Sequence, residues 1–464
     1  MVGSSTSTKV GAALRLPALF ALLLAGMPAG AGELRLVIEG EAGVRNDGNL
    51  EQRAQIEATG SGDEEDRNVA RGGLSFQLSY DLPRADLALI YSPSYEESID
   101  DSEISGTTHR LDLGYEGELT RRLRLRVRER LLKSPNLDLY APLSVAEPVA
   151  VTRRGDQLSH GLDVGFEHDL TRRAVLVVGA QHSLRTFDGE ELEDAPLYDT
   201  ETLVGTLGAT FSLAEDRQLG VSASAGEYDY ERRGEADVQN VGVSYSQGWG
   251  RSGRVSVEAG LFSVESTLLR RGVIALPDAP DEAPGPPVVE EVLTEEEDEG
   301  WRGAVSVSRQ GRFIGWNLGY RHDVSAGFGL GEPTEADSAF AGLSYSPTRR
   351  LTLGLDGNAS RHEPLGDSER AVGTLLQRQD TLNEFAAGTA RLSWTFFQGL
   401  RLTGGYSRIW QSSEVEPFED LSYDRFFLGL AFRVWSSGET PREPDDPQGE
   451  LTDEARDDQE PDAR

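Results

Sequence analysis

The sequence predicts an all-β protein, an antiparallel transmembrane β-barrel of 18 strands. Three observations predict it: apolar and polar residues alternate along many segments, short turns alternate with long connections, and aromatic residues gather at two levels along the strands. Alternation sends successive side chains to opposite faces of a strand. Short turns on one rim and long loops on the other are the pattern of membrane-spanning barrels.

The segment that follows Leu119 shows the alternation most clearly. Its arginines share one face of a strand and are Arg122, Arg124, Arg126, Arg128 and Arg130. The other face carries Leu123, Leu125 and Val127, with Leu131 beyond Glu129. A helix would scatter the same arginines around its axis. The segment is therefore expected to be a strand with one apolar wall and one cationic wall, in a chain whose net charge is -34.

The first 31 residues are typical of a secretory signal peptide. Lys9 and Arg15 supply positive charge, Leu16 to Gly26 form a short apolar core, and Ala29-Gly30-Ala31 resembles a cleavage site. A membrane anchor is the alternative, but the apolar stretch is too short to span a bilayer as a helix. We expect residues 1–31 to be the signal peptide and residues 32–435 to form one barrel domain.

The strand count follows from the tight turns. Eight short polar turns join alternating segments, at 81–84, 119–122, 170–173, 214–217, 248–251, 309–312, 347–350 and 397–399. They give sixteen strands, to which the segments 33–45 and 422–435 add one each. With 18 strands, both ends of the barrel lie on the side of the tight turns.

The other connections are longer. They span 46–68, 96–106, 135–157, 187–200, 230–236, 266–299, 324–336, 362–382 and 411–421. A soluble β-sandwich would show the same alternation, so alternation alone does not separate the two folds.

Aromatic residues favour the membrane barrel. One level precedes the tight turns and contains Tyr80, Phe211, Tyr245, Tyr345, Trp394 and Phe396. A second level lies toward the long loops and contains Tyr91, Tyr320, Tyr406 and Trp410. Two aromatic levels around an aliphatic band are typical of the girdles at membrane interfaces, although each single aromatic could be an ordinary core residue.

The last predicted strand alternates apolar residues on one face and ends in an aromatic residue. The residues are Phe426, Leu428, Leu430, Phe432 and Val434, followed by Trp435. In this respect the chain resembles Gram-negative outer-membrane β-barrels, porin-like or polysaccharide-export-like, at the level of class. The resemblance implies an outer-membrane location with both termini periplasmic, and a last strand that the barrel-assembly machinery recognises.

The chain departs from that family pattern after the last strand. Residues 436–464 carry eleven Asp or Glu against three Arg, and they are rich in Pro. Such a segment cannot bury enough apolar surface to fold, so a disordered acidic periplasmic tail is expected. The tail either only solvates the chain end or docks to a basic periplasmic partner.

The arginine row must face the lumen if the aliphatic wall meets lipid, because Arg on the lipid face costs about 2–4 kcal/mol at the midplane. Acidic residues on the neighbouring strands share that face: Asp112, Glu116, Glu118, Asp163, Glu167 and Asp169. The row is then either a structural ladder paired with these acids or an electropositive track for anions, as rings of Arg are in anion pores. The predicted architecture resembles that of alginate-export barrels, which have the same strand count and an arginine-rich lumen.

Little in the sequence indicates chemistry. The chain has no cysteine, its six histidines are scattered, and no hydrolase, zinc-protease or nucleotide-binding motif occurs. We expect no enzyme activity, no cofactor and no resident metal. The acidic segment 277–299 favours solvated loops over a dedicated calcium site, since it lacks EF-hand spacing. The acidic balance also disfavours nucleic-acid binding.

Together these observations predict an outer-membrane channel or secretion conduit that passes hydrophilic solutes, anionic ones among them, or polysaccharide through an arginine-lined lumen. Two alternatives stay open: a plugged structural barrel that tethers periplasmic partners through its tail, and a barrel enzyme acting on lipid or polysaccharide. Expected partners are outer-membrane lipid, lipopolysaccharide and the assembly machinery.

Overall fold

The structure is a computed structural model of the chain. It describes residues 33–47, 67–99, 105–136, 154–188, 199–231, 233–250, 252–274, 288–325, 332–365, 383–397, 399–413 and 421–436. The expected signal peptide (1–31), and the expected tail beyond Ser436, lie outside these residues. None of the described residues forms an apolar helix long enough to cross a membrane.

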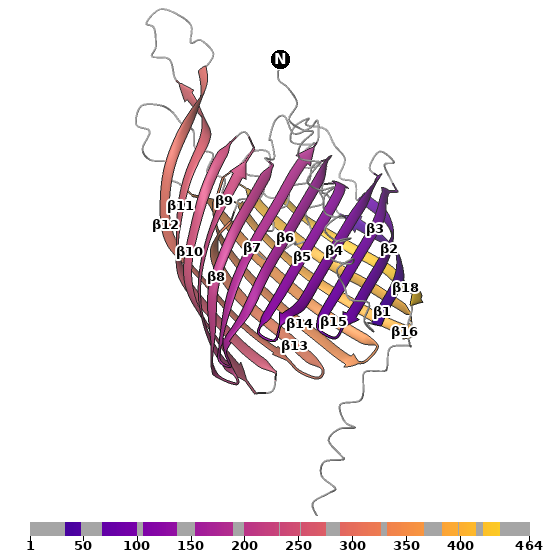
Figure 1. Ribbon diagram of the computed structural model, residues 1–464. Helices are drawn as coiled ribbons and strands as arrows, with labels where there is room; N and C mark the ends of the chain where they lie inside the picture. Colours follow the sequence, from indigo (N-terminus) through magenta and orange to yellow (C-terminus); the bar gives the residue numbers. More distant parts are fainter. Residues whose placement is uncertain are drawn as a thin grey trace, which may run out of the picture.

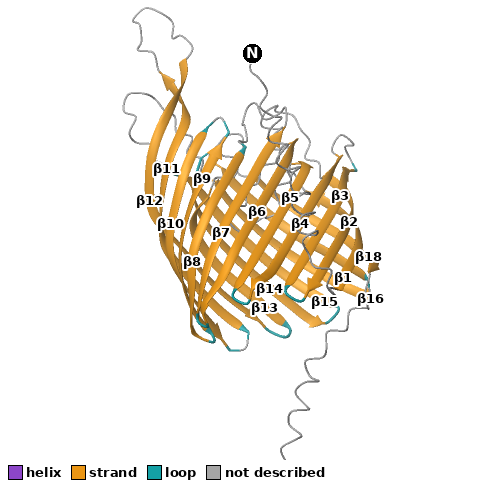
Figure 2. Ribbon diagram, in the orientation of Figure 1, coloured by secondary structure: helices purple, strands orange, loops and turns teal. Residues whose placement is uncertain are grey.

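The described chain is a single closed barrel of 18 antiparallel strands (Figure 1, Figure 2). The strands are β1 (Glu33–Asp47), β2 (Arg67–Leu82), β3 (Ala85–Ser98), β4 (Ser105–Thr120), β5 (Leu123–Asn136), β6 (Arg154–Thr171), β7 (Ala174–Asp188), β8 (Thr200–Ala214), β9 (Arg217–Tyr230), β10 (Gly234–Trp249), β11 (Gly253–Ile274), β12 (Val288–Gln310), β13 (Ile314–Ser325), β14 (Thr334–Thr348), β15 (Leu351–Pro364), β16 (Asn383–Phe397), β17 (Leu400–Ser413) and β18 (Leu421–Ser436). Each strand pairs with its neighbours in sequence, and β1 pairs with both β2 and β18. Closure satisfies the backbone without leaving a sheet edge, which a lipid environment requires.

The predicted fold class and strand number are confirmed by this pairing. The eight tight turns join the strands at one rim, and both ends of the barrel lie at that rim: Glu33 pairs with Asp81 beside the first turn, and the Arg433 amide donates to the Gly399 carbonyl in the last. Gly399 and Gly250 have φ angles of 91° and 61° in two of these turns. Residues with a Cβ atom rarely adopt this backbone conformation.

Two predicted loops are wrong. The connection 230–236 is as short as the tight turns, because β9 ends at Tyr230 and β10 begins at Gly234, which pairs with it. Both ends of the predicted loop 266–299 belong to strands, because β11 continues to Ile274 and β12 begins at Val288. The two strands pair from Gly253–Arg309 to Ile274–Val288 and form a hairpin that rises beyond the rest of the loop rim in Figure 1. The sequence does not predict the start of β12 as a strand, because this part is rich in Glu, which is depleted in most strands.

Strand register separates an outer and an inner face of the wall. On β10 the residues Glu235, Asp237, Gln239 and Val241 are exposed, whereas Ala236 and Val238 between them are buried. Because residues directly paired across strands lie on one face, the outer face can be followed from β11 to β5 along one row: Leu261, Val241, Ala223, Leu207, Val178, Phe166 and Leu125. The inner face can be followed along the adjacent row: Phe262, Asn240, Ser224, Thr206, Gly179, Gly165 and Arg126.

The outer face is a broad apolar surface. Its exposed residues include Leu207, Leu261, Leu318, Leu355 and Leu428, each more than half exposed. A monomeric protein in water rarely exposes a continuous apolar surface of this extent. The interior of the barrel, in contrast, holds most of the charged side chains of the middle of the strands.

Candidate functional site

The arginine row of β5 lies on the inner face. Arg126 belongs to the inner row traced above, and Arg124, Arg128 and Arg130 share its face by alternation. Arg122 lies outside the row, because it occupies the tight turn before β5, where its amide donates to the Thr120 hydroxyl at 3.2 Å. The strand therefore presents four inward arginines, not the five that the sequence predicts.

Carboxylates of the neighbouring strands pair with three of these arginines. Arg124 lies 3.3 Å from both Glu167 and Asp169 of β6. Arg126 lies 3.2 Å from Glu116 of β4 and 3.7 Å from Glu167.

The other two arginines of the row differ from each other. Arg130 lies 4.0 Å from Asp112. Arg128 stands in register opposite Asp163 and Gly114, and it forms no ion pair with a described residue. The row is therefore a ladder of paired charges in which Arg128 is held by no described carboxylate.

Similar ion pairs occur on the inner faces of other strands. Arg71 bridges Glu41 and Glu96 at 3.2 Å and 3.6 Å, and Arg45 also contacts Glu96, at 3.4 Å. Further pairs on this face include Arg302–Glu258, Arg302–Asp323, Arg391–Asp356 and Arg433–Glu39. The described inner wall is therefore lined by closely spaced charges of both signs.

An apolar cluster interrupts this charged wall toward the loop rim. Inward residues of β9, β10 and β11 form it, all at most 4% exposed: Tyr230, Ala236, Val238, Phe262, Val264 and Leu268. Val324 at the end of β13 and Leu365 beyond β15 pack against it. Part of the lumen is thus filled by packed side chains near its loop end.

The outer face carries a feature that sequence reasoning missed. His160 Nε2 donates a hydrogen bond to the Glu129 carboxylate at 3.1 Å, and His182 Nε2 donates one to the Glu201 carboxylate at 3.0 Å. The two histidine rings lie 5.9 Å apart. His322 lies 2.9 Å from Asp337 and 3.2 Å from Glu335 and stacks on Trp301 with ring centroids 4.1 Å apart. Glu129 among the leucines of β5 is the only sequence signal for this arrangement.

No group of three or more metal-binding side chains lies close enough to hold an ion among the described residues.

Known proteins are similar to this chain in overall shape only. No protein-family model and no curated protein matches the sequence. Among solved structures, the ferric-catecholate import receptor Fiu from E. coli K12, in its open form, is 10% identical with a TM-score of 0.42, over 88% of this chain and 82% of the receptor. Pseudomonas aeruginosa OccK2 in complex with glucuronate is 11% identical with a TM-score of 0.41, over 86% and 98%. Acinetobacter baumannii OccAB3 is 10% identical with a TM-score of 0.43, over 87% and 99%.

Similarity at this level says nothing about substrate. The assignment to the class of outer-membrane-type barrels rests on the closed strand order and the two faces of this chain itself.

Proposed function

We propose that the protein spans the outer membrane of a Gram-negative bacterium and conducts hydrophilic solutes through its lumen. The observation that carries the proposal is the opposition of the two faces: one wall surface is apolar, and the other holds ion pairs on β1–β6, β11–β13, β15, β16 and β18. Barrels of this strand number are wide enough for water. The tight turns and both chain ends are assigned to the periplasmic side, and the outward residues of β18 to recognition by the assembly machinery.

The arginine row supports a selective lumen only in a restricted form. Arg124 and Arg126 are paired with carboxylates, and Arg130 lies 4.0 Å from Asp112, which also binds Arg110. Arg128 has no ion-pair partner among the described residues, so it is the member best placed to attract a passing anion. We therefore propose a pore with weak charge selectivity, which admits anionic solutes or polysaccharide segments without requiring them.

Planar-bilayer recording tests this proposal with two matched variants. Replacing the four inward arginines (R124Q/R126Q/R128Q/R130Q) is expected to shift the reversal potential toward cation selectivity. Replacing two of their partners (E116Q/E167Q) is expected to shift it toward anions. Selectivity that neither variant changes would contradict a permeation path past this row.

A plugged barrel is the second candidate, favoured by the apolar cluster around Tyr230 and Phe262. It predicts no conductance from protein that is correctly inserted. It also predicts that removing residues 436–464 abolishes co-purification of a periplasmic partner. Measurable ion flow through the inserted wild-type protein contradicts this candidate.

A further inference from the structure

The shortest strand pairing among the described residues of the barrel joins β12 to β13. It consists of eight residue pairs, from Gly303–His322 to Gln310–Gly315, whereas β12 pairs with β11 along almost its whole length. Loopward of Gly303, no described residue of β12 pairs with β13. β13 itself continues to Ser325 and stays paired with β14. The wall therefore forks at this point, with β12 on one branch and β13 on the other.

The two branches of the fork overlap. Val324, near the end of β13, shares the outer face with Tyr320 and His322 by alternation. It nevertheless packs against the apolar cluster, which consists of inward residues of β9 to β11. An outward side chain can meet inward ones only if the end of β13 lies on the lumen side of the other branch. The apolar cluster is therefore a seal between two layers of the wall, and it covers strand edges that lipid would not tolerate.

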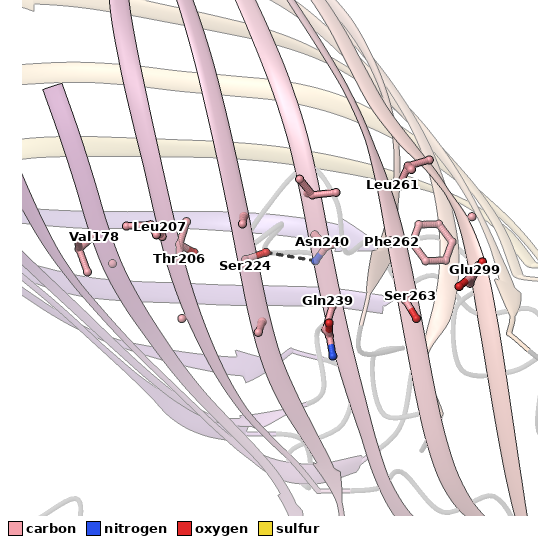
Figure 3. Close-up of a pocket in the computed structure, with 16 residues that line it drawn as sticks. Val178, Thr206, Leu207, Ser224, Gln239, Asn240, Leu261, Phe262, Ser263 and Glu299 are labelled. Carbon is pink, nitrogen blue, oxygen red and sulfur yellow. Dashed lines mark hydrogen bonds between the residues drawn. The ribbon is translucent and has the colours of Figure 1, made fainter. Parts of the chain in front are cut away.

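Two glycines flank the position where β12 leaves β13. Gly300 and Gly303 stand on either side of Trp301 and Arg302. Glycine weakens the interior of a strand and often marks a bend. The ring of Phe262 lies beside β12 in Figure 3 and fills the space over Gly300, where a Cβ atom would collide with it. We infer that β12 bends at the fork, directly beside the seal.

Among the described residues, only side chains join the two branches. On the outer face Trp301 stacks on His322, with ring centroids 4.1 Å apart. On the inner face Arg302 lies 3.6 Å from Asp323. These two contacts, here called the latch, hold the branches together where the backbone pairing has ended.

We propose that the overlap is a lateral gate, through which a molecule with an acyl chain and a polar headgroup passes between the lumen and the outer leaflet. The acyl chain follows the apolar seal between the two layers. The headgroup follows the charged inner face, which reaches the fork through Glu258, Arg302 and Asp323. When the latch opens, β12 bends away at its glycines and the eight-residue pairing stays intact. The proposal rests on the proposed function, because it needs both the lumen and the membrane placement.

The chain has no cysteine, so single introduced thiols report whether the seal opens. Val264→Cys places a thiol in the seal, where Val264 is 1% exposed. Val69→Cys is the matched control, since Val69 is an inward residue of β2 that is 2% exposed and lies outside the seal. Val241→Cys places a thiol on the apolar outer face. Each full-length protein is reconstituted in phosphatidylcholine bilayers and treated, in separate samples, with two reagents. A long-chain N-alkylmaleimide dissolves in the bilayer, and a sulfonated maleimide stays in water.

We expect both reagents to label position 264, because the gate opens to the lipid and to the lumen. The latch variant Trp301→Ala/Arg302→Gln removes the ring stack and the ion pair. It should raise both labelling rates at position 264 about tenfold. The rates at position 69 should not change with the latch substitutions.

A faster rate with the sulfonated reagent alone would mean that the seal opens only to water. A faster rate with the long-chain reagent alone would mean a pocket that is closed toward the lumen. Either result would overturn the lateral gate, and so would unchanged rates at position 264 or an equal rise at position 69. Failure of the membrane placement looks different, since the long-chain reagent would then not label position 241.

Discussion

Two neighbouring outward rows on the loop side of the wall, one through Glu129 and one through Glu201, have different chemistry on the two parts of the wall that they cross. From β5 to β8 they contain Glu129 and Glu201, each hydrogen-bonded to a histidine of the neighbouring strand. From β9 to β12 the first row continues in register as four carboxylates, none of which forms an ion pair with a described residue: Glu227, Asp237, Glu265 and Glu297. The comparison shows that acidic side chains on the outer face are compensated by histidines on one part of the wall and by no described residue on the other.

Both parts border the same apolar surface, and the largest expected effect tests that shared surface. Val243→Arg places a cation on the outer face of β10, where Val243 is 53% exposed. We expect this substitution to destabilise the inserted barrel by about 2–4 kcal/mol, because the guanidinium would enter hydrocarbon. Urea unfolding in phospholipid bilayers measures the effect.

The adjacent Ser244→Arg is the matched control, since Ser244 is also exposed but faces the lumen. It should unfold close to the wild type. Equal losses for the two variants would contradict the assignment of the faces.

Removing the histidine partner of a carboxylate should have the next largest effect on the free energy of unfolding. We expect this effect only where the carboxylate is buried. The side chains of Glu129 and His160 are 9% and 13% exposed. His160→Leu leaves the Glu129 carboxylate covered and without its hydrogen bond, with an expected loss of about 1.5–3 kcal/mol.

The matched change on the next strand is His182→Leu. The Glu201 side chain is 52% exposed and can bind water instead, so the expected loss is under about 1 kcal/mol. Equilibrium unfolding of both variants compares them directly. A larger loss for His182→Leu would mean that coverage of the carboxylate does not control the difference.

The sequence predicts the parts of this structure that depend on a single strand or a single turn. Alternation predicts the faces of β5 and β18, and the polar turns predict the strand number. It does not predict features that depend on which residues stand opposite each other. Glu129 and His160 belong to strands joined by a long connection, so their pairing follows from register alone.

The β11–β12 hairpin was missed for a related reason. A run of glutamates indicates a solvated loop when it is considered alone. When this run pairs with β11, Glu297 and Glu299 lie on the outer face, and the residues between them lie on the inner face. Arg122 was placed in the row because periodicity does not reveal where a strand begins, and the structure puts it in the turn.

The smallest expected effect is a gain in stability on the uncompensated part. Glu265 stands between Asp237 and Glu297, so Glu265→Gln removes two cross-strand repulsions at once. We expect a gain of about 0.2–1 kcal/mol in a bilayer of zwitterionic lipid at low ionic strength. Added salt should reduce the gain, because it screens exposed charges.

The control is Glu201→Gln, which removes a carboxylate that already has a histidine partner and should bring no gain. In bilayers that contain a lipid with a trimethylammonium headgroup, the gain from Glu265→Gln should turn into a loss, since the carboxylate then contributes a favourable contact. A gain that is independent of salt and of lipid charge would show that repulsion along this row is not its cause.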